Sequence, residues 1–373
     1  MKKNIYFIIV LMLFSFSVDS VEASLELSYD LGNAFQMREF NLEKDTLFIP
    51  EFHVRGIYVT GWVAGTSRMD NLIHLVDNSI LNTMVIDIKD EHGDLSYISN
   101  IPLANEIGAD RRKVKDITAL LSILNDKGIY TIARLVLFRD TLLATNRPDL
   151  ALNMYNTETN EIIRSTSWVN PFRRAVWDYN IQVAKDAINM GFDEIQFDYI
   201  RYPAQGDRVL QSLLPHGRSK SSVINDFSNY ALNELSDYDV PISIDVFGMT
   251  TTVNNDLGIG QNFNDLAEKF RIISPMIYPS HYGPGVYGIE NPDLEPYNLI
   301  NRSLRDALRK IESIEDNDDI IIRPWLQDFS LNNRYTYKEV LEQIRAAENL
   351  GIKEWLLWNP SSNYQEAALK PPY

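Results

Sequence analysis

Short apolar runs of strand-like composition alternate along the chain with longer stretches of helical periodicity. The runs are rich in β-branched and aromatic residues, which is typical of β-strands. They predict strands at residues 55–62, 82–90, 128–138, 192–203, 240–248, 273–282, 320–329 and 353–360. Apolar residues between them recur with a helical period, for example over 116–128, 173–191 and 338–351.

Eight strand and helix alternations predict an α/β fold, a (β/α)8 TIM barrel, because parallel strands need helical crossovers. Gly128, Gly191 and Gly351 stand where helix C-terminal caps belong, just before the next strand. An open doubly wound sheet is the alternative, but the glycines that begin at Gly258 lack the phosphate-binding spacing. We expect a single barrel domain over 55–373 with a short extension at 24–54.

The strand at 192–203 carries polar side chains on one of its faces. Ile195, Phe197 and Tyr199 alternate with Gln196 and Asp198, and a strand sends alternate side chains to opposite faces. In a barrel one face meets the helices and the other meets the axis. We therefore expect Ile195, Phe197 and Tyr199 to face the helices. Gln196 and Asp198 are expected on the axis, near the strand end where barrel enzymes carry their chemistry.

The strand at 240–248 repeats this pattern, with Ser243 and Asp245 on the polar side, so two carboxylates are expected at one mouth. The same parity places further polar and aromatic side chains on the inner face, namely Asp87, Lys89, Arg134, Tyr278, Arg323, Trp325 and Gln327. Buried charges persist only when they are paired or functional. For the charged members of this group, a paired ionic layer and a substrate-binding role both stay open.

The first residues resemble a secretory signal peptide. Two lysines precede an apolar run from Ile5 to Val18, and Val21 and Ala23 fit the small-residue rule of a cleavage site. An uncleaved membrane anchor is the alternative. It is disfavoured because the run is shorter than the about 20 residues that span a bilayer. We expect cleavage after Ala23, a secreted or cell-envelope-associated protein, and no stable membrane insertion afterwards.

Composition narrows the partners and the chemistry. The formal charge of -16 disfavours nucleic acid, whose binding relies on Lys and Arg, and a neutral or cationic polymer fits better. The lack of cysteine excludes disulfides, thiolate metal sites and a cysteine nucleophile. The five histidines show no metal-ligand spacing. No cofactor and no metal are expected, and a turn around Gly93 is favoured over a cation loop.

Two carboxylates among aromatic residues suit the hydrolysis of glycosidic bonds. One carboxylate acts there as nucleophile or base and the other as general acid. Aromatic rings offer flat apolar surfaces to sugars, and the strand ends carry Trp62, Tyr202, Tyr278, Tyr282, Trp325 and Trp358. His281 could bind a ligand, although a lone histidine is more often structural.

The successive strand motifs resemble a bacterial putative glycoside hydrolase family that is distantly similar to the alpha-amylase-like barrels. They read "RGIYVTGW", "VIDIKDEHGDLSY", "WVNPFRRAVWDYNIQVAKDAINMGFDEIQFDYIRYP", "ISIDVFG", "SPMIYPSHY", "RPWLQDF" and "WLLWNP", from about Arg55 to Pro360. The resemblance implies a (β/α)8 barrel and a carbohydrate-active hydrolase.

The alpha-amylase-like barrels place an aspartate nucleophile at the end of strand four, and Asp198 matches that place. Their general acid is a glutamate on strand five, where this chain has Asp245. Asp328 in "WLQDF" is the alternative acid. Gln196 replaces the arginine that precedes the nucleophile by two positions in those barrels.

We therefore predict an exported barrel that hydrolyses a polysaccharide or cell-envelope glycan through Asp198 and Asp245. The predicted substrate-binding residues are Asp87, Lys89, Arg134, Gln196, Arg201, Tyr202, Tyr278, His281, Trp325, Gln327, Asp328, Trp358 and Asn359. The segments 91–114, 139–170 and 204–222 are expected to wall the cleft. The alternatives are an inactive glycan-binding barrel and a metal-dependent glycan deacylase, which would need histidines and carboxylates around one ion.

The signal-peptide interpretation predicts that the mature chain begins at Ser24, because the small residues of a cleavage site end at Ala23. N-terminal sequencing of protein recovered outside the cells measures this directly. Recovery of a chain that begins at Met1 in the membrane fraction would contradict the prediction.

Overall fold

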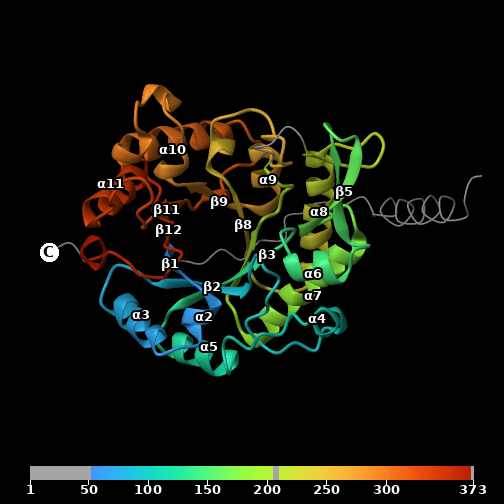
Figure 1. The fold of residues 1–373 in the computed structure, drawn as a ribbon. Helices are drawn as coiled ribbons and strands as arrows, with labels where there is room; N and C mark the ends of the chain where they lie inside the picture. The colour runs from blue at the N-terminus through green and yellow to red at the C-terminus, as the bar shows by residue number, and fades with distance from the viewer. Residues whose placement is uncertain (1–51, 205–209, 371–373) are drawn as a thin grey trace, which may run out of the picture. The chain divides into compact units, whose positions relative to one another are not determined.

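The computed structural model describes residues 52–204 and 210–370 (Figure 1). The predicted signal peptide (1–23) and nearly all of the predicted extension (24–54) lie outside the described residues. Among the helices that are described, none has the length and apolar character needed to cross a bilayer.

Parallel strands close into a barrel at the centre of the fold (Figure 1). They are β1 (Arg55–Val59), β2 (Thr83–Lys89), β3 (Tyr130–Val136), β6 (Glu194–Asp198), β8 (Ile242–Phe247), β9 (Ile272–Ile277), the split strand β10 (Ile321–Ile322) and β11 (Trp325–Gln327), and β12 (Trp355–Trp358). Pairing of β12 with β1 and of β8 with β9 leaves no open edge between first and last strands. The predicted (β/α)8 barrel is confirmed, with a strand in each of the predicted runs.

Helices surround the barrel and cover the outer faces of its strands (Figure 1). They are α2 (Gly61–Ala64), α3 (Arg68–Asp77), α4 (Pro102–Ile107), α5 (Ile117–Asp126), α6 (Thr141–Asn146), α7 (Arg174–Met190), α8 (Lys220–Leu235), α9 (Phe263–Phe270), α10 (Pro296–Glu312) and α11 (Tyr337–Glu348). Phe197 of β6 contacts Phe227 of α8 and Phe270 of α9, so it faces the helices as predicted. Gly191 ends α7 in a left-handed conformation with φ 104°, which favours glycine.

The segment 139–170, expected as a loop, contains regular structure. It holds α6 and an antiparallel hairpin of β4 (Ala151–Asn156) and β5 (Glu161–Val169), and β7 (Leu210–Ser212) pairs with β4. Ile162 and Ile163 of β5 are both exposed, at 67% and 37%. Because the hairpin does not bury one face consistently, its sequence lacks the alternation that reveals a half-buried strand.

An ionic layer fills the barrel where the strands begin. The Arg323 guanidinium donates from Nη1 to Glu194 Oε1 at 2.7 Å and from Nε to Glu354 Oε2 at 2.8 Å. The Ser243 hydroxyl also donates to Glu194 Oε1, at 2.5 Å. Burial raises the pKa of Glu194, and the Arg323 charge opposes that rise. Arg323 therefore belongs to a paired ionic layer and is not available to bind a substrate.

This layer predicts a large stability loss for Arg323→Leu. The substitution leaves Glu194 and Glu354 buried without their shared cation, which costs about 3–5 kcal/mol for a broken buried ion pair. Urea denaturation of the variant and of the wild type measures the free energy of unfolding. Arg305→Leu, at an exposed helix position, is the matched control. A loss no larger than that of the control would contradict a stabilising role for the layer.

Candidate active site

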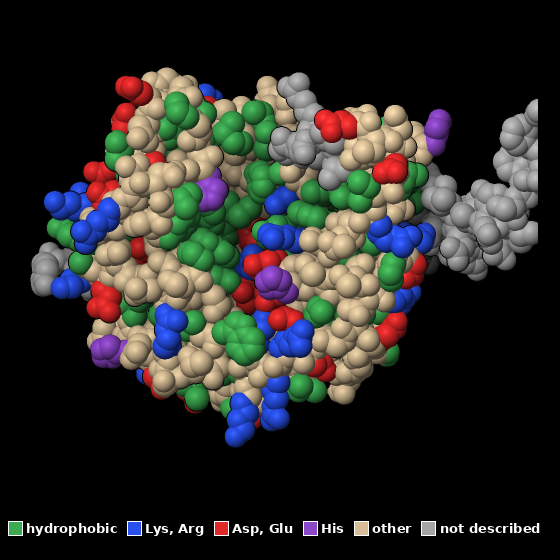
Figure 2. All heavy atoms as spheres, viewed as in Figure 1, with side chains coloured by type: hydrophobic (Ala, Val, Ile, Leu, Met, Phe, Trp, Pro, Cys, Tyr) green, Lys and Arg blue, Asp and Glu red, His purple; other side chains and the backbone are tan. Residues whose placement is uncertain are grey.

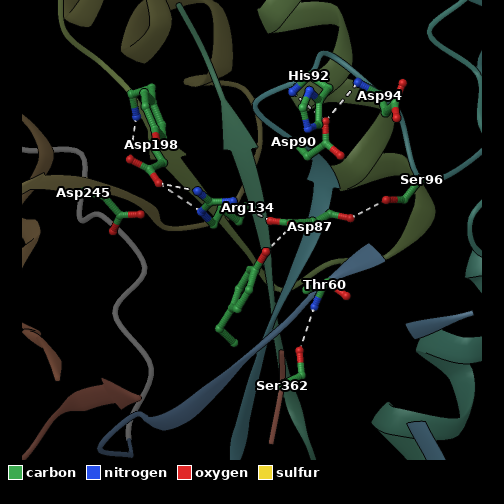
Figure 3. A network of polar contacts seen from close by, with 12 residues as sticks. Thr60, Asp87, Asp90, His92, Asp94, Ser96, Arg134, Asp198, Asp245 and Ser362 are labelled. Carbon is green, nitrogen blue, oxygen red and sulfur yellow. Dashed lines mark hydrogen bonds and ion pairs between the residues drawn. The ribbon is translucent and has the colours of Figure 1, made fainter. Parts of the chain in front are cut away.

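Charged and aromatic side chains converge at the carboxyl ends of β1, β2, β3, β6 and β8. Asp87, Arg134, Asp198 and Asp245 come from neighbouring strands; hydrogen bonds join the first three, and Asp245 lies beside them (Figure 3). All four side chains are almost completely buried. The predicted convergence of Asp198 and Asp245 on one mouth is supported by the parallel register of β6 and β8, in which Phe197 pairs with Ile244 and the two aspartates come next on adjacent strands.

Arg134 links two of the carboxylates across three adjacent strands. Its Nη1 donates to Asp87 Oδ1 at 2.6 Å, and its Nε and Nη2 donate to Asp198 Oδ2 at 3.0 and 2.5 Å (Figure 3). The Tyr58 hydroxyl donates to the other oxygen of Asp87. Burial raises the pKa of Asp87 to about 6, although the Arg134 charge opposes this rise. Tyr58 was missed from the sequence because β1 reads as an ordinary apolar strand.

Asp245 has a different environment. The Trp325 indole Nε1 donates to its Oδ1 at 2.7 Å, and no cation of the described chain forms an ion pair with it. Burial raises the pKa of Asp245 well above its usual range, and the nearby negative charge of Asp198 raises it further. The two predicted catalytic aspartates therefore differ: one is paired with a guanidinium, and the other is held by a neutral donor.

Aromatic side chains surround the charged network. Tyr58 stacks on Trp358 with ring centroids 3.9 Å apart, and Trp325 meets Trp358 edge-on at 5.4 Å. Tyr278 packs in the same cluster, next to Phe329. In the space-filling view, hydrophobic and charged side chains gather in a hollow at the centre of the face seen in Figure 2. Trp325 itself is 1% exposed, so it positions Asp245 rather than offering a surface to a ligand.

The chain leaves β6 sharply after Asp198. Tyr199 has φ 52°, and its backbone N–H donates to Asp198 Oδ1 at 2.6 Å. Its ring lies near Trp168 of β5, and its hydroxyl accepts a hydrogen bond from Arg139 Nη1 at 2.9 Å. The expectation that Tyr199 faces the helices is wrong, because β6 ends at Asp198 and the backbone of Tyr199 no longer continues the strand. Trp168 and Arg139 escaped the sequence analysis because they stand in the supposed loop.

Lys89 is not on the inner face, contrary to the prediction. The register of β2 against β3 shifts between Asp87 and Lys89, so the extra residue reverses the facing of the side chains that follow. The Lys89 ammonium forms a 2.8 Å ion pair with Asp140 and donates to Asn180 of α7 at 3.1 Å. It is a buried structural cation beneath α7.

Several other predicted substrate-binding residues are occupied by internal contacts. Tyr202 is wholly buried, so its ring offers no exposed surface to a ligand. Gln327 hydrogen-bonds the backbone of Ser280 and Phe329, and Asn359 hydrogen-bonds the backbone of Asp328 and Asn363. These three predictions are not supported by the positions of the side chains.

Gln196 and Asp328 also lie apart from the charged network. Gln196 is inside the barrel as expected, but its amide contacts Ser274. Asp328 accepts a hydrogen bond from the backbone N–H of Gln365, and burial raises its pKa to about 7. Its hydrogen-bond partners belong to the C-terminal segment, which weakens its candidacy as the general acid.

The remaining aromatic and histidine candidates lie at different depths. His281 is exposed and its ring lies 5.5 Å from that of Tyr278, at the edge of the aromatic cluster. Tyr282 is buried, whereas Trp62 on α2 is 60% exposed with the Lys113 ammonium over its ring. Of these three residues, only His281 contacts the aromatic cluster around the charged network, through the ring of Tyr278.

The acidic stretch after β2 forms a turn. Asp90 accepts hydrogen bonds from the backbone N–H groups of His92 and Asp94 (Figure 3). It also forms an ion pair with Lys113. Gly93 has φ 90° at the tip of this turn. Across residues 52–204 and 210–370, no group of three or more His, Cys, Asp or Glu side chains is arranged to hold a metal ion.

Comparisons with known proteins add the family and the fold. The model of a family described as "putative glycosyl hydrolase domain" matches residues 56–364. A hypothetical protein from Ruminiclostridium thermocellum ATCC 27405 is 34% identical over 54% of this chain and 98% of its own, with a TM-score of 0.45. The PgaB (BpsB) glycoside hydrolase domain from Bordetella bronchiseptica is 11% identical over 86% of this chain and all of its own, with a TM-score of 0.60. No curated protein sequence matches the chain.

The environment of Asp245 predicts a pH-dependent stability difference. Its pKa is raised in the folded protein above the value of about 3.9 in the unfolded chain. The unfolded state therefore loses this proton first, so the stabilisation is full below the unfolded pKa and is lost as the pH rises toward the folded pKa. Asp245→Asn stays neutral and should melt at a higher temperature than the wild type near pH 8.

Thermal melts of both proteins between about pH 4 and about pH 8 measure this, and the difference should shrink toward the acidic end. Asp126→Asn, at an exposed helix position, controls for the loss of one carboxylate. A destabilisation of Asp245→Asn by the same amount at every pH would contradict the prediction.

Proposed function

This chain belongs to the family described as "putative glycosyl hydrolase domain", and we propose that it hydrolyses glycosidic bonds of a polysaccharide or cell-envelope glycan. In this proposal Asp198 is the nucleophile or base and Asp245 is the general acid. The observation that carries it is the contrast between two buried aspartates on the adjacent strands β6 and β8. Glycosidases need such a pair, with one carboxylate charged and one protonated.

Asp198 is suited to the charged role. Two N–H groups of the Arg134 guanidinium contact its Oδ2, so a cation balances the carboxylate charge. Its Oδ1 accepts only the backbone N–H of Tyr199 among the described residues. That oxygen retains a lone pair for attack on a sugar carbon or for activation of a water molecule.

Asp245 is suited to the protonated role. Burial and the nearby charge of Asp198 raise the pKa of Asp245 well above its usual range, which favours the protonated form, and the Trp325 indole occupies Oδ1. Oδ2 has no hydrogen bond within residues 52–204 and 210–370, and it is not among the fully enclosed polar atoms. It is therefore the oxygen from which a proton can reach the departing glycosidic oxygen.

The rim of the site supplies surfaces for sugar rings. Trp358 and Phe329 are only partly buried and border the aromatic cluster of Tyr58, Tyr278 and Trp325. Burial raises the pKa of Tyr278 well above its usual range, and the charges of the two aspartates raise it further. Tyr278 is therefore a neutral phenol that can donate a hydrogen bond to a sugar hydroxyl.

The proposal includes export. It is supported by the apolar run and the Val-Glu-Ala site at the beginning of the chain. Polysaccharides and cell-envelope glycans lie outside the cytoplasm, so a secreted or envelope-associated location matches the proposed substrates. A glycan-binding barrel without turnover is the alternative function.

The proposed roles predict distinct kinetics for two isosteric substitutions. Asp198→Asn should lower turnover by several orders of magnitude on every substrate, because the amide loses the charge that stabilises an oxocarbenium-like transition state. Asp245→Asn should spare aryl glycosides with good leaving groups, because these need little protonation. The measurement is product release from a panel of bacterial and plant glycans and the matching aryl glycosides, with Asp126→Asn as the control.

Melting temperatures separate this outcome from a structural role. If Asp198→Asn melts far lower than the wild type yet keeps its turnover per folded molecule, the carboxylate supports the barrel and not the chemistry. Binding of a glycan by the wild type without any product would favour the glycan-binding alternative.

A further inference from the structure

Buried cations in the described chain nearly all have carboxylate partners. Five Lys or Arg side chains are buried among these residues, namely Lys89, Lys113, Arg134, Arg201 and Arg323. Four of them form ion pairs with Asp or Glu at distances of 2.8 Å or less. Within residues 52–204 and 210–370, Arg201 has no such partner. A buried charge without a counterion is unfavourable, so its retention calls for an explanation.

Aromatic rings enclose Arg201. Its guanidinium carbon Cζ lies 5.0 Å from the ring centroid of Trp168, 4.7 Å from that of Tyr199 and 4.3 Å from that of Phe247. The one hydrogen bond that the guanidinium donates to a described residue runs from Nη1 to the carbonyl of Tyr202 at 3.0 Å. Its other nitrogens are not among the fully enclosed atoms that lack a partner, so they remain open to a ligand. Burial lowers the pKa of Arg201 to about 10, which leaves it charged at neutral pH.

A second guanidinium shares the same aromatic ring. Arg139 lies with its Cζ 5.4 Å from the Tyr199 ring centroid and donates to the Tyr199 hydroxyl. It too lacks an Asp or Glu within ion-pair distance in the part of the chain that the structure describes. The two like charges repel each other across one ring, and the positive charge of Arg139 lowers the pKa of Arg201. The chain has 51 acidic residues, so this arrangement does not reflect a shortage of carboxylates.

The pair adjoins the proposed catalytic aspartates. Tyr199 directly follows Asp198 and is hydrogen-bonded to it. Phe247 ends β8, two residues after Asp245. Figure 2 shows Lys or Arg side chains beside Asp or Glu side chains in the central hollow. The two guanidiniums therefore lie within the reach of a sugar next to the bond that would be cleaved.

We propose that Arg139 and Arg201 bind a carboxylate of the substrate, so that the cleaved glycan carries a carboxylate-bearing sugar beside the scissile bond. This inference rests on the proposed hydrolysis at Asp198 and Asp245. Guanidinium groups present several N–H donors in a plane and bind carboxylates in a bidentate manner. Trp168 and Tyr199 add flat surfaces for the apolar face of the same sugar.

The acidic character of the whole chain does not oppose this site. Charges farther apart than about 8–10 Å are largely screened at physiological ionic strength, so the two adjacent guanidiniums dominate locally. This proposal departs from the sequence-based expectation of a neutral or cationic polymer, because an acidic sugar can enter if its carboxylate reaches this pair. Dense polyanions such as nucleic acid remain disfavoured.

The test is a comparison of acidic oligosaccharides with their carboxyl-reduced forms. Isothermal titration calorimetry of the full-length mature protein would use two acidic probes, oligogalacturonate and oligosaccharides that contain muramic acid. These arms distinguish a ring carboxylate from a lactyl carboxylate. At least one acidic probe should bind about tenfold or more tightly than its reduced form, because hydrogen bonds to charged groups contribute about 1.5–3 kcal/mol.

Substitutions assign that preference to the two arginines. Arg201→Gln and Arg139→Gln should each reduce the affinity for the acidic probe toward that for the reduced one, and Arg201→Lys should be intermediate because it keeps the charge without the planar donors. Arg174→Gln is the matched control, since Arg174 also lies over an aromatic ring but pairs with Asp178. Arg201→Gln should melt no lower than the wild type, because it removes an unpaired buried charge.

Equal binding of acidic and reduced probes by the wild type, or no binding of either acidic probe, would overturn the inference. So would a preference for acidic probes that survives in both Arg201→Gln and Arg139→Gln. A carboxylate preference without hydrolysis would retain this site and overturn the proposed activity. Hydrolysis of neutral glycans without any preference would do the reverse.

Discussion

The contact of the Arg134 guanidinium with Asp87 and Asp198 is the interaction on which the mouth of the barrel depends. The barrel closure brings three carboxylates, including Asp245, into one buried space. Arg134 supplies one positive charge on the strand between β2 and β6. One cation cannot balance three anions, so protonation of a carboxyl group is favourable. Asp245, which has no cation of its own, is the group that holds its proton most strongly by this argument.

The barrel contains two ionic clusters, and their surroundings suit one to a structural role and the other to a chemical role. At the beginning of the strands, Arg323 lies between Glu194 and Glu354, with the Ser243 hydroxyl as a further donor. At the carboxyl ends, Arg134 likewise lies between two carboxylates, but a third, that of Asp245, lies nearby without a cation of its own, and aromatic side chains border the cluster. An apolar layer that includes Val85, Ile132 and Leu356 packs in the core between these clusters. The first cluster is closed by protein, whereas the second lies beside an aromatic cluster whose outer members, such as Trp358, are only partly buried.

Additions to the barrel determine what surrounds the carboxylates. The hairpin β4–β5 brings Trp168 to the ring of Tyr199, and the left-handed turn at Tyr199 directs that ring toward Arg139. These contacts join an insertion after β3 to the end of β6. Barrel enzymes commonly vary specificity through such segments while the strands stay constant. The same separation holds here, with the carboxylates on strands and the unpaired arginines on the connections that follow them.

The sequence by itself determined the alternation of strands and helices, the barrel, and the inward direction of Asp87, Arg134, Asp198 and Asp245. These follow from local periodicity, which a single chain displays without reference to distant residues. The tertiary structure decided which carboxylate received the guanidinium, because hydrogen bonds between strands depend on register and closure. It also reversed two local predictions: a bulge turned Lys89 toward α7, and the end of β6 turned Tyr199 into the mouth. One extra residue or one positive φ moves the following side chains to the opposite face of the strand, and neither can be recognised from the pattern of apolar positions.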